Sequence, residues 1–147
     1  MGFSIAKLFN TKISKPESND SIEAILKAVE NTPYGISENN VLFAGLNELG
    51  GYFFFQTVIV GELSVKCKNG ASLLFSGTHF ELKLESDMPE FESDRSDVKG
   101  RYLTKIDFQI EKSDIKKLEK ATLKNIQLSV KKHRILFTKH VVSDEEE

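Results

Sequence analysis

The chain has 147 residues, and its 20 basic and 22 acidic side chains give a formal net charge of −2 at pH 7. Hydrophobic residues make up 39% of it, and no apolar run reaches the roughly eighteen residues that a membrane-spanning helix needs. Pervasive disorder and a membrane span are therefore not expected, and a chain of this length can bury one core without disulfides or metals.

The first 19 residues are expected to form an N-terminal arm that ends in a linker at Lys15-Pro16-Glu17-Ser18-Asn19. Residues 20–142 are expected to form a single α+β domain, and residues 143–147 an acidic disordered tail. Apolar and basic side chains in the arm are irregularly spaced, which favours local docking over contact with an anionic membrane.

A helix is predicted over residues 21–31. Asp20 can cap it, with Glu23 at the third helical position in a variant of the capping box. Its apolar residues fall on one face: Ile22, Ile25, Leu26 and Val29. Pro33 and Gly35 then favour a turn.

Residues 37–51 are ambiguous, because Leu42, Leu46 and Leu49 suit a helix capped by Ser37, whereas residues 41–44 also suit a short strand. We favour the helix, which leaves Gly50-Gly51 as its stop or as a turn. Residues 52–60 are apolar at both odd and even positions, which predicts a central strand covered on both faces. A bulge at Gly61 would let this strand continue beyond residue 60.

The stretch from Gly61 to Glu85 has the clearest alternation in the sequence and predicts an antiparallel meander. A three-residue loop, Lys68-Asn69-Gly70, with Gly70 left-handed, pairs Cys67 with Ala71 and brings the apolar residues of both strands to one face. This places Cys67 inward, as a small core residue rather than a nucleophile. Gly77-Thr78 is expected to form a type II′ turn that pairs Phe75 with Phe80.

Residues 86–100 lack periodicity and are expected to form a long loop, followed by a half-buried strand over residues 102–111. A short helix is predicted near residues 113–121, capped by Ser113, with Ile115 and Leu118 facing inward. Alternation then resumes and predicts a final hairpin in which Val130 pairs with Ile135, although a longer turn is an alternative.

Neither a metal site nor a cofactor site is expected. His79, His133 and His140 lack zinc-binding spacing, and no phosphate-binding glycine loop is present. The acids of the 86–100 loop lack the order of a calcium-binding EF-hand, so a solvated loop is favoured. Because Cys67 is the single cysteine and no signal-peptide core is seen, we expect a cytoplasmic location.

Charge is distributed unevenly. Residues 85–97 hold six acids against Arg95, whereas residues 112–139 hold nine bases against Asp114 and Glu119. This predicts an acidic loop and a basic face, and the basic face supplies the candidate partner-binding residues Lys112, Lys116, Lys120, Lys131, Lys132 and Arg134.

The expected fold is α+β: a mostly antiparallel sheet of about six or seven strands, as a sandwich or a curved half-barrel, with an N-terminal helix and a short helix near residues 113–121. The expected function is a non-catalytic interaction module, because recognisable catalytic motifs are missing and surface charge is asymmetric. An acidic protein is the expected partner, ahead of a nucleic acid, and the oligomeric state is left open. The alternatives are a carrier of an apolar small molecule in a phenylalanine-lined cavity, and an enzyme whose site is not visible in the sequence.

Overall fold

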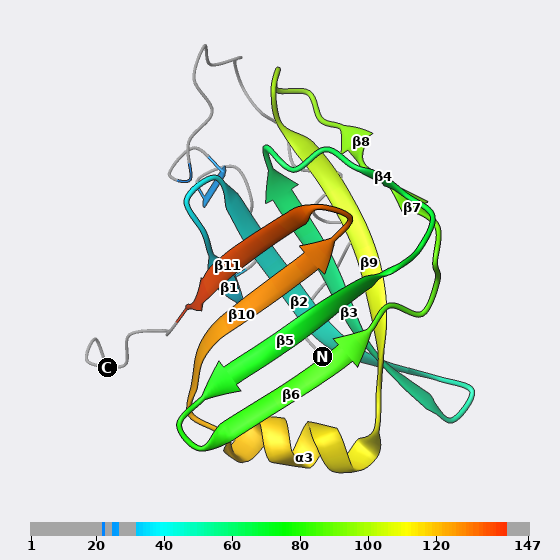
Figure 1. The fold of residues 1–147 in the computed structure, drawn as a ribbon, viewed down its shortest axis with the longest axis vertical. Helices are drawn as coiled ribbons and strands as arrows, with labels where there is room; N and C mark the ends of the chain where they lie inside the picture. The colour runs from blue at the N-terminus through cyan, green and yellow to red at the C-terminus, as the bar shows by residue number, and fades with distance from the viewer. Residues whose placement is uncertain (1–21, 23–24, 27–31, 141–147) are drawn as a thin grey trace.

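The structure is a computed structural model that describes residues 22, 25, 26 and 32–140. These residues form a strongly curled antiparallel sheet with one short helix across one end (Figure 1). Nine strands lie in the order β6-β5-β10-β11-β1-β2-β3-β9-β8, and β4 and β7 form a separate two-stranded sheet. The elements are β1 (Gly35–Ile36), β2 (Asn40–Leu49), β3 (Tyr52–Gly61), β4 (Lys66–Cys67), β5 (Ala71–Gly77), β6 (Phe80–Glu85), β7 (Phe91–Glu92), β8 (Asp94–Arg95), β9 (Tyr102–Ile110), α3 (Lys112–Lys120), β10 (Leu123–Val130) and β11 (His133–Lys139).

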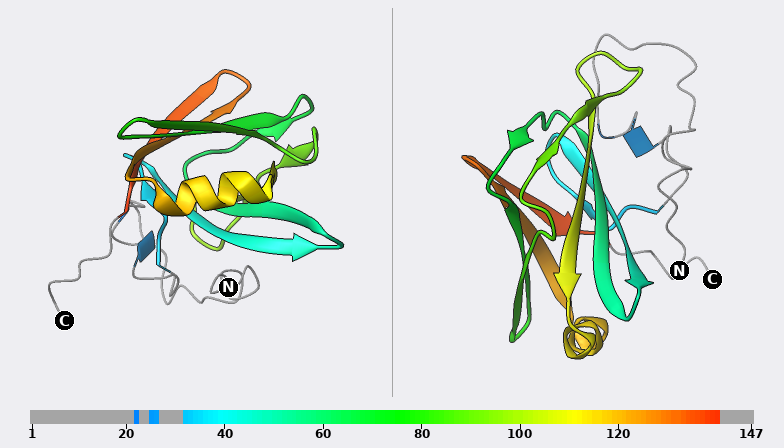
Figure 2. Two further views of the ribbon diagram at one scale, coloured as in Figure 1. Left: turned by 90° about the horizontal axis from the view of Figure 1, so that it is seen from below. Right: turned by 90° about the vertical axis from the view of Figure 1, so that its right-hand side faces the viewer.

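The large sheet curls until β6 approaches β9 from the other side. An isolated bridge between Ser86 and Phe108 joins them, and the backbone N–H of Asp87 donates to the carbonyl oxygen of Asp107 at 2.8 Å. The sheet is thus a curled half-barrel, and α3 lies across its lower end, in front of the opening in the left view of Figure 2 and at the bottom in the right view. The predicted curved half-barrel is confirmed over the sandwich, but the predicted strand count was too low.

The inner face of the sheet is filled by large apolar side chains. The rings of Phe55 and Phe75 meet edge to face at 5.3 Å between centroids, and Tyr34 contacts Phe55 in the same way at 5.4 Å. Phe108 and Phe137 are completely buried in the same cluster. Such contacts between rings add to the stabilisation from burial alone.

A second, smaller cluster lies on the other face of β2 and β3. It contains Val41, Phe43, Val58 and Val60, and Ile25 packs against them with 1% of its surface exposed. The prediction that β3 is covered on both faces is confirmed at Val58 and Val60.

Most of the predicted helix over residues 21–31 lies outside the described residues, so that helix is not confirmed. Its residues Ile22, Ile25 and Leu26 are described, and all three contribute to the second cluster. The predicted arm (1–19) and acidic tail (143–147) also lie outside the described residues.

The prediction of a helix over residues 37–51 was wrong, because β2 pairs with β3 along its whole length, from Asn40 opposite Gly61 to Leu49 opposite Tyr52. The Ser37 hydroxyl accepts a hydrogen bond from the Asn40 N–H at 2.9 Å and donates to the Asn40 carbonyl at 3.0 Å. Ser37 therefore shapes the turn before β2. Burial on both faces of β2 removes the alternation that would have identified a strand.

The first hairpin of the predicted meander was also wrong. Cys67 of β4 pairs with Phe91 of β7 instead of Ala71, because β5 already has β6 and β10 as neighbours. β3 ends at Gly61 and does not continue through it into β4. Two parts of the prediction are confirmed: Gly70 has a φ of 84°, and Cys67 is buried in the same cluster as Ala71.

The second hairpin exists, but its register differs from the predicted one by two residues. Gly77 pairs with Phe80 and Phe75 with Leu82, so Thr78 and His79 form the turn, with His79 at a φ of 54°. A two-residue shift keeps each side chain on its predicted face. Gly77 is needed for another reason: a Cβ there would overlap the carbonyl oxygen of Thr122.

The remaining elements follow the predictions in outline. β9 and α3 are confirmed, but Glu111 occupies the N-cap position without a side-chain cap hydrogen bond, so Ser113 is not the cap. The final hairpin has a two-residue turn in which Val130 pairs with His133, not with Ile135. The predicted loop over residues 86–100 instead contains β7, β8 and a buried Val98.

Candidate functional site

The hairpin between β2 and β3 ends in an exposed apolar tip. Leu49 and Tyr52 are 65% and 72% exposed and flank Gly50-Gly51. Both glycines have positive φ, 61° and 88°, and a Cβ added to either would meet nothing within 4 Å. Figure 2 shows this hairpin projecting beyond the barrel at the α3 end. We refer to residues 49–52 as the hairpin tip.

A groove of about 550 Å³ lies beside the hairpin tip, where β3 begins and β9 ends. Its lining combines aromatic with polar and charged side chains. These are Tyr52, Phe53 and Phe54, and Asp87, Gln109, Glu111 and Lys112, together with the apolar Ile110. We refer to it as the tip groove.

Asp87 is the most firmly held carboxylate of the tip groove. Its backbone N–H donates to the Asp107 carbonyl at 2.8 Å, and Gln109 Nε2 donates to its Oδ1 at 2.7 Å. The segment that leaves β6 touches β9 at this point, so the closure of the barrel itself brings Asp87 to Gln109. A carboxylate fixed in this way loses little conformational entropy when it binds a ligand.

A second groove, of about 250 Å³, lies along the middle of β3 and β9. Asp107 lines it together with Gln56 and Lys105. Burial raises the pKa of the Asp107 carboxyl above its usual value. The negative charge of nearby Asp87 raises this pKa further, whereas a hydrogen bond with Gln56 and the positive charge of Lys105 lower it. A carboxyl with a raised pKa is what acid–base chemistry requires.

The candidate partner-binding residues do not form one surface. Lys112, Lys116 and Lys120 are exposed on α3, just before β10 begins, and Lys131, Lys132 and Arg134 lie at the turn where β10 ends. A strand of eight residues spans more than about 20 Å at roughly 3.3 Å per residue. The six residues therefore lie in two separate basic patches, since α3 and the β10–β11 turn stand at opposite ends of β10 (Figure 1). Their role in binding a partner stays a prediction.

The patch at the β10–β11 turn is partly engaged within the protein. Lys131 Nζ donates to the Lys66 carbonyl at 3.0 Å, and Arg134 Nη1 donates to the carbonyls of Lys131 and His133 at 3.2 and 3.1 Å. The lysines on α3 stand closer to the tip groove, and Lys112 lines it. Only the α3 patch adjoins the groove.

The predicted acidic loop is likewise divided. Asp87 belongs to the tip groove, Glu90 to the second groove, and Asp94 to β8. Within the described residues, His, Cys, Asp and Glu side chains do not gather in a group of three or more that could hold a metal ion. Nor does this part of the chain contain a helix with the length and apolar character to cross a membrane.

Sequence reasoning missed the hairpin tip and the tip groove. The available signal was Gly50-Gly51 between apolar residues, which fits a two-residue hairpin turn as well as a helix stop. Asp87 and Gln109 are 22 positions apart, and no local pattern indicates that they meet.

Comparison with known proteins finds no match to a family model, to a curated protein or to a solved structure.

Proposed function

We propose that the protein is a non-catalytic interaction module that docks a partner protein at the α3 end of the half-barrel. The exposure of Leu49 and Tyr52 on a projecting hairpin carries this proposal. Exposed apolar groups rimmed by polar ones mark interaction sites, and tyrosine is enriched among the residues that dominate binding energy.

The α3 patch supplies the charge for this docking. Lys112, Lys116 and Lys120 are exposed on the helix at the same end of the barrel, because Ile115 and Leu118 face the core. Cationic groups at the rim of an interface mainly raise the rate of association with an acidic partner. The partner we propose is therefore a protein whose docking surface is acidic around an apolar centre.

The interior of the barrel does not support the carrier alternative. Tyr34, Phe55 and Phe75 contact one another there, and Phe108 and Phe137 are completely buried. Aromatic side chains thus already occupy the space that a bound apolar molecule would need.

Affinity purification with matched surface variants tests the docking proposal. The variant Leu49→Ser/Tyr52→Ser removes the apolar tip, and Leu136→Ser removes a 55% exposed leucine on β11, away from the tip. We expect the double variant to lose the partner that the wild type and the Leu136→Ser variant both retain. Equal recovery of the same proteins by all three would refute docking through the tip.

One observation favours a second candidate, acid–base catalysis in the groove along β3 and β9. The raised pKa of Asp107, beside a space of about 250 Å³, meets a basic requirement for such chemistry. Screening the wild type and an Asp107→Asn variant against a panel of ester, phosphoester and glycoside substrates tests it. Turnover by the wild type that the variant lacks would support an enzyme, and no turnover of any substrate would leave the binding module as our proposal.

A further inference from the structure

We propose that the tip groove binds an arginine side chain of the docked partner, an inference that rests on the docking function proposed above. Tyr52 and Phe54 line the groove together with the carboxylates of Asp87 and Glu111. Aromatic rings attract a cation through their negatively polarised faces, and carboxylates attract it through charge and hydrogen bonds. An aromatic groove with two acids therefore fits a cationic group better than an anionic or purely apolar one.

The charge of the lining has the sign that this ligand requires. Asp87 and Glu111 contribute two negative charges and Lys112 one positive charge, so the lining has a net charge of −1. Glu111 is the N-cap residue of α3, and its side chain does not cap the helix. The helix therefore does not use this carboxylate at its N-terminus.

Asp87 is oriented in advance by contacts of both its side chain and its backbone. Gln109 Nε2 holds its Oδ1 at 2.7 Å, and the backbone of the same residue is anchored to Asp107. A carboxylate has two oxygens and accepts several hydrogen bonds, so the one from Gln109 leaves capacity for a ligand.

Arginine fits this combination better than lysine. Its guanidinium is planar, stacks on aromatic rings while donating in its own plane, and is less strongly hydrated than an ammonium group. Arginine and tyrosine are both enriched among the residues that dominate protein–protein binding energy. Such an arginine adds one cationic contact beside the apolar centre of the docking surface, while the acids of that surface lie at its rim, opposite the lysines of α3.

A nuclear magnetic resonance titration of the whole ¹⁵N-labelled protein tests this inference. The probe is Nα-acetyl-arginine amide, and its matched control is Nα-acetyl-citrulline amide, which has nearly the same shape but is uncharged. We expect saturable shifts of the Tyr52, Gln109 and Glu111 amides with the arginine probe, and much smaller shifts with citrulline. Equal shifts with both probes, or none with either, would overturn the inference.

The variant Asp87→Asn isolates the charge of that residue, because an asparagine oxygen can still accept the hydrogen bond from Gln109. We expect it to weaken arginine binding about tenfold, the loss typical of a charge-assisted hydrogen bond. Asp94→Asn removes an exposed acid of the same stretch that does not line the groove, and should leave the affinity unchanged. Equal effects of both variants would mean that general charge, not the groove, attracts the probe.

This inference and the docking proposal can fail separately. If the Leu49→Ser/Tyr52→Ser variant loses its partner while the arginine probe does not bind the wild type, docking through the tip is supported and arginine binding is refuted. If the probe binds the wild type but the Leu49→Ser/Tyr52→Ser variant retains the partner, the groove is a cation site and docking through the tip is refuted.

Discussion

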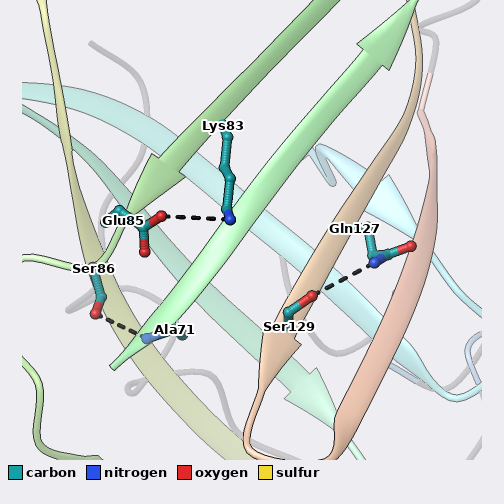
Figure 3. A network of polar contacts seen from close by, with 6 residues as sticks. All are labelled: Ala71, Lys83, Glu85, Ser86, Gln127 and Ser129. Carbon is teal, nitrogen blue, oxygen red and sulfur yellow. Dashed lines mark hydrogen bonds and ion pairs between the residues drawn. The ribbon is translucent and has the colours of Figure 1, made fainter. Parts of the chain in front are cut away.

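Ser86 and Phe108 form the bridge that brings β6 to β9, and the side chain of Ser86 ties this junction to the first residue of β5. Its Oγ accepts a hydrogen bond from the Ala71 N–H at 3.0 Å (Figure 3) and donates to the Met88 carbonyl at 2.9 Å. Ser86 thus marks the point where the chain leaves β6, beside the start of β5, and meets β9. The next residue is Asp87, so this junction also positions the tip groove.

Replacing Ser86 with alanine should lower the free energy of unfolding by about 1 kcal/mol, because the Ala71 N–H loses its side-chain acceptor. Urea denaturation measures this change. Ser113→Ala is the matched control: Ser113 is exposed on α3 and makes no cap hydrogen bond, so its loss should cost less than about 0.5 kcal/mol. A Ser86→Ala effect no larger than the control would show that the junction contributes little to stability.

Gly77→Ala should be more destabilising than Gly70→Ala. A Cβ on Gly77 would overlap the backbone of Thr122, which cannot move without displacing the start of β10, so we expect a loss of about 2 kcal/mol or more. Gly70 has a φ of 84° but is less closely surrounded, and alanine there should cost about 1 kcal/mol. Urea melts of both variants give the order, and the reverse order would contradict the observed position of β10.

Cys67 should be protected from thiol reagents in the folded protein. It is 2% exposed, and its thiol lies 3.2 Å from the Gly70 carbonyl oxygen, to which it donates. Labelling in native buffer should therefore be far slower than in urea. In a Cys67→Ser background, Ser113→Cys supplies an exposed control thiol that should react at once. Equally fast labelling of Cys67 would show that β4 opens readily.

Asp107→Asn should raise the melting temperature at pH 7. The pKa of Asp107 is raised in the folded protein, so this group favours folding when protonated, and its contribution is lost as pH rises through the folded pKa. Asparagine removes this half-buried charge. The gain in melting temperature should shrink as pH falls below about 4, where aspartate is protonated in both the folded and the unfolded state. Melting curves between pH 3 and pH 8, with exposed Asp94→Asn as control, measure this trend. A gain that grows toward acid pH would contradict the burial of Asp107.

The sequence predicted best those strands that bury a single face. In β9, Thr104, Ile106, Phe108 and Ile110 are buried and alternate with more exposed residues, so period-two alternation identified the strand directly. The face of Cys67 was correct for the same reason. Pairing was harder to predict, because the neighbours of β5 include β10, which comes about fifty residues later in the chain.

β2 shows why the remaining elements could not be predicted. Val41, Leu42 and Phe43 are all buried, since both faces of this strand are covered, and Leu42, Leu46 and Leu49 happen to have helical spacing. The misassigned helix then concealed the hairpin tip. The tip groove also depends on the crossing at Ser86, a non-local contact that periodicity does not report.

Photo-crosslinking inside the native host cell tests docking through the hairpin tip most directly. A photoreactive phenylalanine derivative placed at Leu49 should form a discrete adduct with one partner protein, whereas the same group at Leu136, which is also exposed, should not. Adding the Lys116→Glu/Lys120→Glu change should reduce the yield at Leu49, because the α3 patch assists association. The same adducts from both positions, or adducts from neither, would contradict our proposal that the protein docks its partner through the tip.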